Sequence, residues 1–191
     1  MADTLATAAD LRALLDEDET SLTDDKAAVL LQLATGAVQA AAGQDLLAVV
    51  DDTAQLLGDT DVWLTLPQRP VTAVSSVSID GRPVTDFKRF GDRLWRRCGW
   101  ATCPGEPSVV DVVNSHGYED WDSKLGLARS AVLSVAARMF ANPVGVTGQS
   151  IDDFSQQFSQ STNSDLSGLI PENLRKSLRR AYGARARFVK L

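Results

Sequence analysis

His116-Gly117-Tyr118, at the end of a valine-rich segment, opens the part of the chain that specifies the fold most clearly. An alanine-rich helix follows and stops before Asn142-Pro143, because proline cannot continue a helix. A polar segment leads from there to the basic sequence Leu174-Arg175-Lys176-Ser177-Leu178-Arg179-Arg180-Ala181-Tyr182. The pattern specifies helix lengths, stop signals and a polar loop. It therefore indicates an assembly module rather than a catalytic centre.

The alanine-rich helix has a regular apolar stripe. Asp122 or Ser123 can cap its N-terminus. Its apolar residues then recur at spacings of three and four: Leu125, Ala128, Val132, Val135 and Met139. Such a stripe predicts packing on another helix.

Two further helices are expected near the N-terminus. Thr7 and Asp10 fit a helix start, with Leu11, Leu14 and Leu15 as its apolar stripe. A longer helix begins after Thr23 and ends at Gly43. Its apolar positions at helical spacing are Ala27, Leu30, Leu31, Ala34 and Val38. Because it is apolar over more than half of its circumference, it is either central to a core or packed on a neighbouring subunit.

Between residues 61 and 118 the apolar period changes from that of a helix to that of a strand. Leu64 and Leu66 alternate with more polar positions, as do Val77 and Ile79. Asp80-Gly81 and Gly91-Asp92 are typical turn sequences. We therefore predict an α+β fold with about four helices. Its parts are N-terminal helices over 1–60, an inserted antiparallel β-unit over 61–118, and C-terminal helices over 119–191.

The C-terminal part contains two segments of distinct composition. Residues 147–167 are rich in Ser, Gln, Asp and Gly, and we expect a mobile loop whose few large apolar groups are Ile151, Phe154, Phe158 and Leu166. Pro171 fits the first turn of a final helix that Gly183 closes. A basic tail follows this helix.

Composition limits the possible classes of function further. Of the 25 acidic residues, 13 fall within residues 1–61, whereas residues 172–191 hold seven Lys or Arg; the net charge is -6. An acidic body disfavours sequence-specific DNA binding unless the tail acts alone. The chain has no apolar run long enough for a membrane span and no signal-peptide pattern. Cys98 and Cys103 are too few for a disulfide framework, so reduced thiols in a cytoplasm-like compartment are expected.

Catalytic and metal-binding interpretations find little support in the sequence. His116 is the single histidine and follows a strand, which favours a structural role. Neither cysteine has partners for a zinc site. The acidic pairs Asp24-Asp25, Asp51-Asp52 and Asp152-Asp153 fit a helix start and two loop-like segments rather than a magnesium site. We therefore expect no enzyme, metal or cofactor.

The order of these motifs resembles the head-tail connector, or adaptor, proteins of tailed phages, which also occur in prophages and gene transfer agents. The resemblance covers roughly residues 8–183. It is carried by the helix pair, Pro70-Val71-Thr72-Ala73-Val74, His116-Gly117-Tyr118, the Asn142-Pro143 helix end, the loop from Ser150 to Ser155 and the terminal helix. Members often have a proline soon after the Gly-Tyr pair, where this chain has Glu119-Asp120-Trp121-Asp122.

The resemblance implies a virion protein at the head-tail interface, assembled in the host cytoplasm. Such a subunit forms a homo-oligomeric ring, twelve-fold in the virion, under the portal protein. The ring extends the channel for double-stranded DNA, without sequence-specific binding, and carries the stopper and tail-completion proteins. Contacts with the portal or a neighbouring subunit are expected from the cationic C-terminal residues and from the apolar residues of the loop. These residues are Arg175, Arg179, Arg180, Arg185, Arg187, Phe188, Lys190, Ile151, Phe154 and Phe158.

Two alternatives remain beside the connector. A DNA-binding accessory protein would act through the basic C-terminal segment, and an uncharacterised enzyme has no positive signal. The tryptophans Trp63, Trp95, Trp100 and Trp121 are expected to be core or interface anchors. Exposure of Trp95 or Trp100 near Arg93, Arg96 and Arg97 would favour single-strand binding instead.

Overall fold

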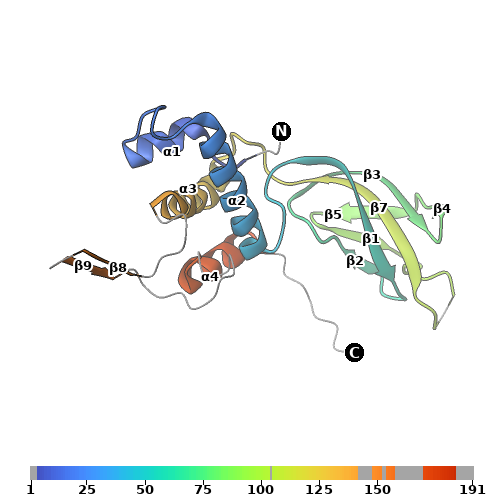
Figure 1. Ribbon diagram of the computed structural model, residues 1–191. Helices are drawn as coiled ribbons and strands as arrows, with labels where there is room; N and C mark the ends of the chain where they lie inside the picture. Colours follow the sequence, from blue (N-terminus) through green and yellow to red (C-terminus); the bar gives the residue numbers. More distant parts are fainter. Residues whose placement is uncertain (1–3, 104, 142–147, 152–153, 158–169, 184–191) are drawn as a thin grey trace. The chain divides into compact units, whose positions relative to one another are not determined.

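The computed structural model describes residues 4–103, 105–141, 148–151, 154–157 and 170–183 (Figure 1). The chain divides into two compact units. The described residues of 1–43 and 123–183 form a helical unit, and residues 44–122 form a β-unit. The predicted α+β class is therefore confirmed.

The helical unit contains four α-helices among its described residues. They are α1 (Ala8–Leu15), α2 (Asp24–Ala42), α3 (Gly126–Ala141), which follows the 3-10 turn η1 (Ser123–Leu125), and α4 (Glu172–Ala181). Local sequence explains the first two: Thr7 and Asp10 form a capping box at α1, and Gly43 ends α2 in the left-handed conformation at φ 80°. None of the described helices has the length and apolar character of a membrane span.

The long helix α2 organises this unit by packing against α1, α3 and α4. Its buried side is formed by Ala27, Leu31, Ala34, Thr35, Val38, Ala41 and Ala42. The facing stripe of η1 and α3 contains the buried Leu125, Ala128, Ala131, Val132, Val135 and Ala136. Tyr182 follows α4; its hydroxyl donates to the Lys124 carbonyl over 2.6 Å and accepts from the Ala128 amide over 3.3 Å. The end of α4 is thereby tied to the start of α3.

Two antiparallel sheets form the β-unit. The first has the order β1-β7-β3-β4, with β1 (Val49–Gly58), β7 (Ser108–His116), β3 (Val71–Ile79) and β4 (Arg82–Pro83). The second has the order β2-β6-β5, with β2 (Trp63–Thr65), β6 (Arg93–Arg96) and β5 (Phe87–Phe90). Both predicted turns are present: Asp80 and Gly81 have positive φ between β3 and β4, as has Gly91 between β5 and β6.

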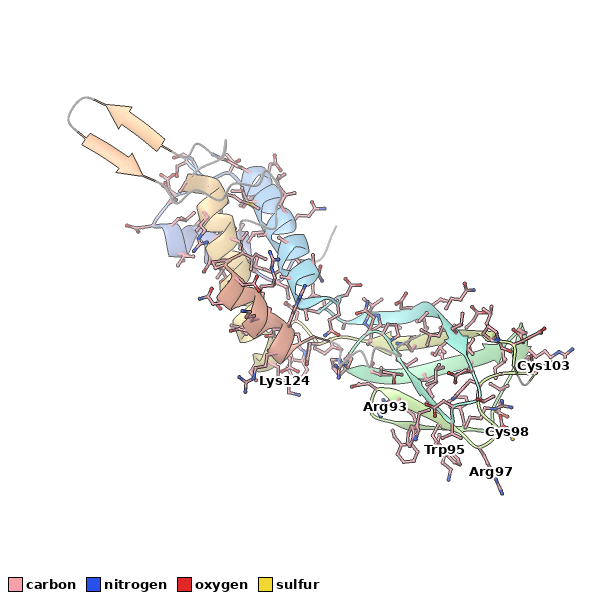
Figure 2. All side chains as sticks on the ribbon, turned by 90° about the horizontal axis from the view of Figure 1, so that it is seen from below. Arg93, Trp95, Arg97, Cys98, Cys103 and Lys124 are labelled. Carbon is pink, nitrogen blue, oxygen red and sulfur yellow. The ribbon has the colours of Figure 1, made fainter. Side chains whose placement is uncertain are left out.

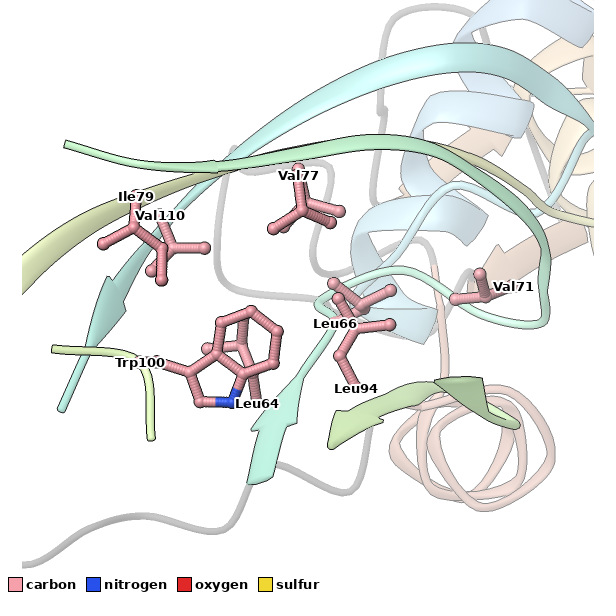
Figure 3. Packing of buried hydrophobic residues seen from close by; sticks show 9 residues of the cluster. Leu64, Leu66, Val71, Val77, Ile79, Leu94, Trp100 and Val110 are labelled. Atoms are coloured by element: carbon pink, nitrogen blue, oxygen red, sulfur yellow. The ribbon is translucent and has the colours of Figure 1, made fainter. Parts of the chain in front are cut away.

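The core of the β-unit gathers side chains from both sheets (Figure 3). It consists of Leu64, Leu66, Val71, Val77, Ile79, Leu94, Trp100, Val110 and Val112. Trp100 is fully buried, and its indole N–H donates to the Val62 carbonyl over 3.3 Å. Gly58 lies against Trp100, because an added Cβ would overlap the Trp100 carbonyl oxygen. Trp100 is therefore a core anchor, which is one of the two roles expected for the tryptophans.

Several features differ from the sequence expectations. The segment 1–60 is not helical throughout, since β1 occupies Val49–Gly58 and Asp51-Asp52 lies in this strand rather than in a loop. The sequence did not predict this strand because its apolar–polar alternation is interrupted. Asp51 has φ 53°, and the pairing with β7 shifts between Val49 and Asp52. Leu14 is exposed and Leu30 is half-buried, so neither is a core residue.

The expected loop over 147–167 also contains regular structure. Strands β8 (Gly148–Ile151) and β9 (Phe154–Gln157) pair as an antiparallel hairpin. Asp152-Asp153 and residues 158–169 lie outside the described residues. The expected mobility of the segment remains a prediction.

Candidate subunit and partner interfaces

One side of α2 carries apolar and small residues that are exposed or half-buried in the described part of the helical unit. This α2 stripe comprises Val29, Leu33, Gly36, Ala37 and Ala40. Its side is opposite the buried Leu31 and Val38 on the helical wheel. Val29 is 57% exposed and Leu33 is 47% exposed. No charged residue occurs between Val29 and Ala40, so the stripe has the composition of an interface core rather than of a solvated helix surface.

Gly36, within the α2 stripe, has no close packing neighbour among the described residues that would require a glycine. It is helical, and a Cβ added to it would meet nothing within 4 Å. Glycine inside a helix destabilises it by about 0.5–1 kcal/mol relative to alanine. A missing side chain at an open position is expected where another chain approaches the helix closely.

A shallow groove extends the stripe toward α4. It is lined by Gly36, Ala37, Ala40, Ala41, Ile170, Arg175 and Arg179. Arg179 donates its Nε hydrogen to the Ala41 carbonyl over 3.3 Å, at the C-terminal end of α2. A guanidinium at this position satisfies a carbonyl that the helix leaves without an internal partner. The groove therefore has an apolar floor and a cationic rim.

The structure brings together some of the predicted contact residues. Arg175 and Arg179 lie one turn apart on α4 and both line the groove, whereas Arg180 is exposed and does not. Ile151 and Phe154 are paired residues of the β8–β9 hairpin. The other predicted contacts, Phe158, Arg185, Arg187, Phe188 and Lys190, lie outside the described residues. The sequence left open whether α2 is central to a core or packed on a neighbouring subunit, and it did not indicate which residues of the helix remain exposed.

The His116-Gly117-Tyr118 motif has a structural role in the β-unit. His116 is buried and its Nε2 lies 3.1 Å from Oδ2 of Asp52. Gly117 has φ 94°, and an added Cβ would overlap the Leu47 carbonyl oxygen. The Tyr118 amide donates to the Leu46 carbonyl over 2.8 Å. The motif thus holds the C-terminal end of β7 beside the segment that leads into β1.

The cysteines and the acidic side chains of the described part of the chain have the following surroundings. Cys98 and Cys103 are free and exposed. Within that part, no group of three or more His, Cys, Asp or Glu side chains could hold a metal ion. Asp80 serves the fold instead: it accepts from the Thr102 hydroxyl over 2.8 Å and from the Val109 amide over 2.9 Å. These hydrogen bonds, chiefly that from Thr102, lower the pKa of Asp80.

Comparison with known proteins finds no matching family model and no matching curated protein. Among solved structures, a chain from the neck of an empty GTA particle, computed with C6 symmetry, is 16% identical with a TM-score of 0.52; the match covers 95% of this chain and 91% of that chain. A chain from the virion of the native gene transfer agent (GTA) particle is 18% identical, with the same TM-score and coverage. This chain therefore shares, over nearly its whole length, the fold of proteins in gene transfer agent particles.

Proposed function

We propose that this protein is a head-tail adaptor of a phage-like particle. In this role it forms a ring under the portal protein, extends the DNA channel and carries the stopper and tail-completion proteins. The observation that supports this most is the fold likeness to a chain of a GTA particle neck, which extends over 95% of this chain and includes both units. The ordered motifs of the sequence point to the same protein class.

The α2 stripe supports ring formation by a second copy of this chain. Val29 and Leu33 offer exposed apolar side chains, and Gly36 leaves room for a neighbouring backbone. Burying an apolar surface of this kind contributes roughly 25 cal/mol per Å². A ring also needs heterologous contacts, in which one surface meets a different surface of the next copy. The neck particle with C6 symmetry is consistent with such a cyclic arrangement.

The charge of the chain fits a channel through which DNA passes. A net charge of -6 weakens electrostatic binding of phosphates, so a duplex is not held while it moves. The cationic residues of α4 and of the tail suit an acidic portal surface, and we assign the portal contact to Arg175, Arg179 and the segment 184–191. The DNA-binding alternative uses the same residues and predicts a steep dependence of DNA affinity on salt.

Electron microscopy of portal-bearing capsids mixed with the purified chain tests the proposal. We expect a ring of added density at the portal vertex. Leu33→Lys should abolish this ring because it places a charge in the α2 stripe. Leu14→Lys is the matched control, since Leu14 is 55% exposed on α1 outside the stripe.

Absence of added density with the native chain would refute the adaptor function. Equal rings with Leu33→Lys and Leu14→Lys would remove the α2 stripe from the interface. Truncation after Gly183 tests the tail: undiminished docking of the truncated chain would show that residues 184–191 are not the portal contact. A filter-binding titration with duplex DNA at two salt concentrations measures the alternative.

A further inference from the structure

The outer face of the β2–β6–β5 sheet combines aromatic and cationic side chains. Residues alternate between the two faces of a strand, and Leu64 and Leu94 point into the core. The opposite face therefore carries Trp63 and Thr65 of β2, Lys88 and Phe90 of β5, and Arg93 and Trp95 of β6. The strand register places them in two rows, Trp63–Trp95–Lys88 and Thr65–Arg93–Phe90. We call this surface the aromatic face.

The rings of the aromatic face meet above its central strand. Trp63 and Phe90 come from the two outer strands, yet their centroids are 5.6 Å apart in an edge-to-face arrangement with an interplanar angle of 67°. Trp63 remains 41% exposed and Phe90 56% exposed. Because the sheet beneath them is fixed by the buried Leu64 and Leu94, the rings form a preorganised apolar platform.

The cations of the aromatic face have no acidic partner in the described structure. Lys88, Arg93 and the adjacent Arg97 take part in no ion pair among the described residues, and Figure 2 shows Trp95 and Arg97 on the same side of the β-unit. Arg96, which points to the other face, instead pairs with Asp86 over 2.8 Å. Strands β2, β5 and β6 contain no Asp or Glu, although the whole chain has a net charge of -6.

We propose that the aromatic face is a docking surface for a second neck protein whose contact surface presents carboxylates around an apolar patch. Exposed Trp and Phe flanked by Arg form the composition of interface hot spots. Lys88, Arg93 and Arg97, which take part in no ion pair among the described residues, complement carboxylates on the partner's surface. The proposal rests on the adaptor function for the identity of the partner as a neck component.

The ring geometry favours a protein partner over single-stranded nucleic acid. Base stacking needs aromatic faces open to successive bases. Here the edge of one ring meets the face of the other, at 67°, so the pair does not present two parallel open faces. An apolar side chain from a protein can pack against such a pair from any direction.

Biolayer interferometry with the intact chain tests the proposal, using the separately purified portal protein and stopper protein of the same particle as probes. Phe90→Ser removes part of the apolar platform, and Arg93→Glu reverses one charge. Both should raise the Kd for one of these two proteins by about tenfold or more, which corresponds to the loss of a hot-spot contact of about 1.4 kcal/mol. Arg93→Glu should act mainly through a slower, salt-dependent association rate.

Arg82→Glu is the matched control, because Arg82 is exposed on β4 in the other sheet of the same unit. We expect its Kd to stay within about twofold of the native value, as for charges outside an interface core. Circular dichroism melts of all three variants verify that they fold. If Phe90→Ser does not fold, Arg93→Glu still tests the aromatic face.

Native affinity in both Phe90→Ser and Arg93→Glu would overturn the proposal, as would native chain that binds neither neck protein. Binding of single-stranded oligothymidylate with quenching of tryptophan fluorescence, lost in Phe90→Ser, would also overturn it and assign the face to nucleic acid. If the native chain forms rings at the portal vertex but the variants of the aromatic face bind the neck proteins with native affinity, this inference is rejected and the adaptor function is not. Absence of rings with the native chain would reject the adaptor function itself.

Discussion

Leu31 and Leu33 provide a direct test of which side of α2 belongs to the subunit core. The two leucines are two residues apart, so they lie on opposite sides of the helix. Leu31 is 2% exposed and Leu33 is 47% exposed. The same substitution by alanine should therefore have different effects at the two positions.

The expected magnitudes follow from burial. Leu→Ala removes three buried carbons, the isopropyl group, at about 0.8 kcal/mol per carbon, which is roughly 2.4 kcal/mol in all, and the remaining cavity adds to this. We expect Leu31→Ala to lower the free energy of unfolding by about 3 kcal/mol. Leu33→Ala should lower it by less than about 0.5 kcal/mol but weaken ring formation, because the contacts that we propose for Leu33 would be made only in the ring.

Urea unfolding followed by circular dichroism measures the first quantity, and electron microscopy of portal-bearing capsids measures the second. A loss below about 0.5 kcal/mol in Leu31→Ala would contradict its place in the core. An equal loss of stability in both variants would show that α2 is turned differently from the orientation described. Normal ring formation by Leu33→Ala, with Leu33→Lys also normal, would remove this residue from the subunit interface.

Three further predictions concern the fold. Gly117→Ala should destabilise the β-unit by about 2 kcal/mol or more, because φ at this position is 94° and the new Cβ would overlap the Leu47 carbonyl oxygen. A melting temperature equal to that of the native chain would contradict this. Trp100→Ala should lower the free energy of unfolding by about 3–5 kcal/mol in thermal or urea unfolding, because the side chain is fully buried. A loss under about 1 kcal/mol would show that Trp100 is not central to the core. Hydrogen bonds, first that from the Thr20 hydroxyl, lower the pKa of Asp18 from 3.8 to about 2. The stability that this carboxylate adds is therefore complete above pH 3.8 and is lost as the pH falls through about 2. Thr20→Val should raise the pKa of Asp18 in an NMR titration, and an unchanged value would exclude the hydroxyl as the main cause.

Local sequence signals predicted several helix ends and two turns, because these features depend on neighbouring residues. The Thr7–Asp10 capping box, Gly43 at the end of α2 and the Asp80-Gly81 turn each depend on residues within one turn of chain. Periodicity likewise predicted the stripe of α3. Strand β1 was missed because its alternation is interrupted near Asp51 and because an edge strand of a sheet is only half covered.

The surfaces that we propose for assembly depend on long-range packing that the sequence pattern does not contain. An α2 helix that is apolar on most sides was predicted from the sequence alone, but only the packing of α3 and α4 shows that Leu31 is covered and Leu33 is not. Similarly, turn and strand signals predicted both strands of the β5–β6 hairpin. Only the pairing of β2 with β6 brings Trp63 to Phe90, and among the described residues the cations of that face take part in no ion pair. Tertiary contacts decide which sides of amphipathic elements remain exposed.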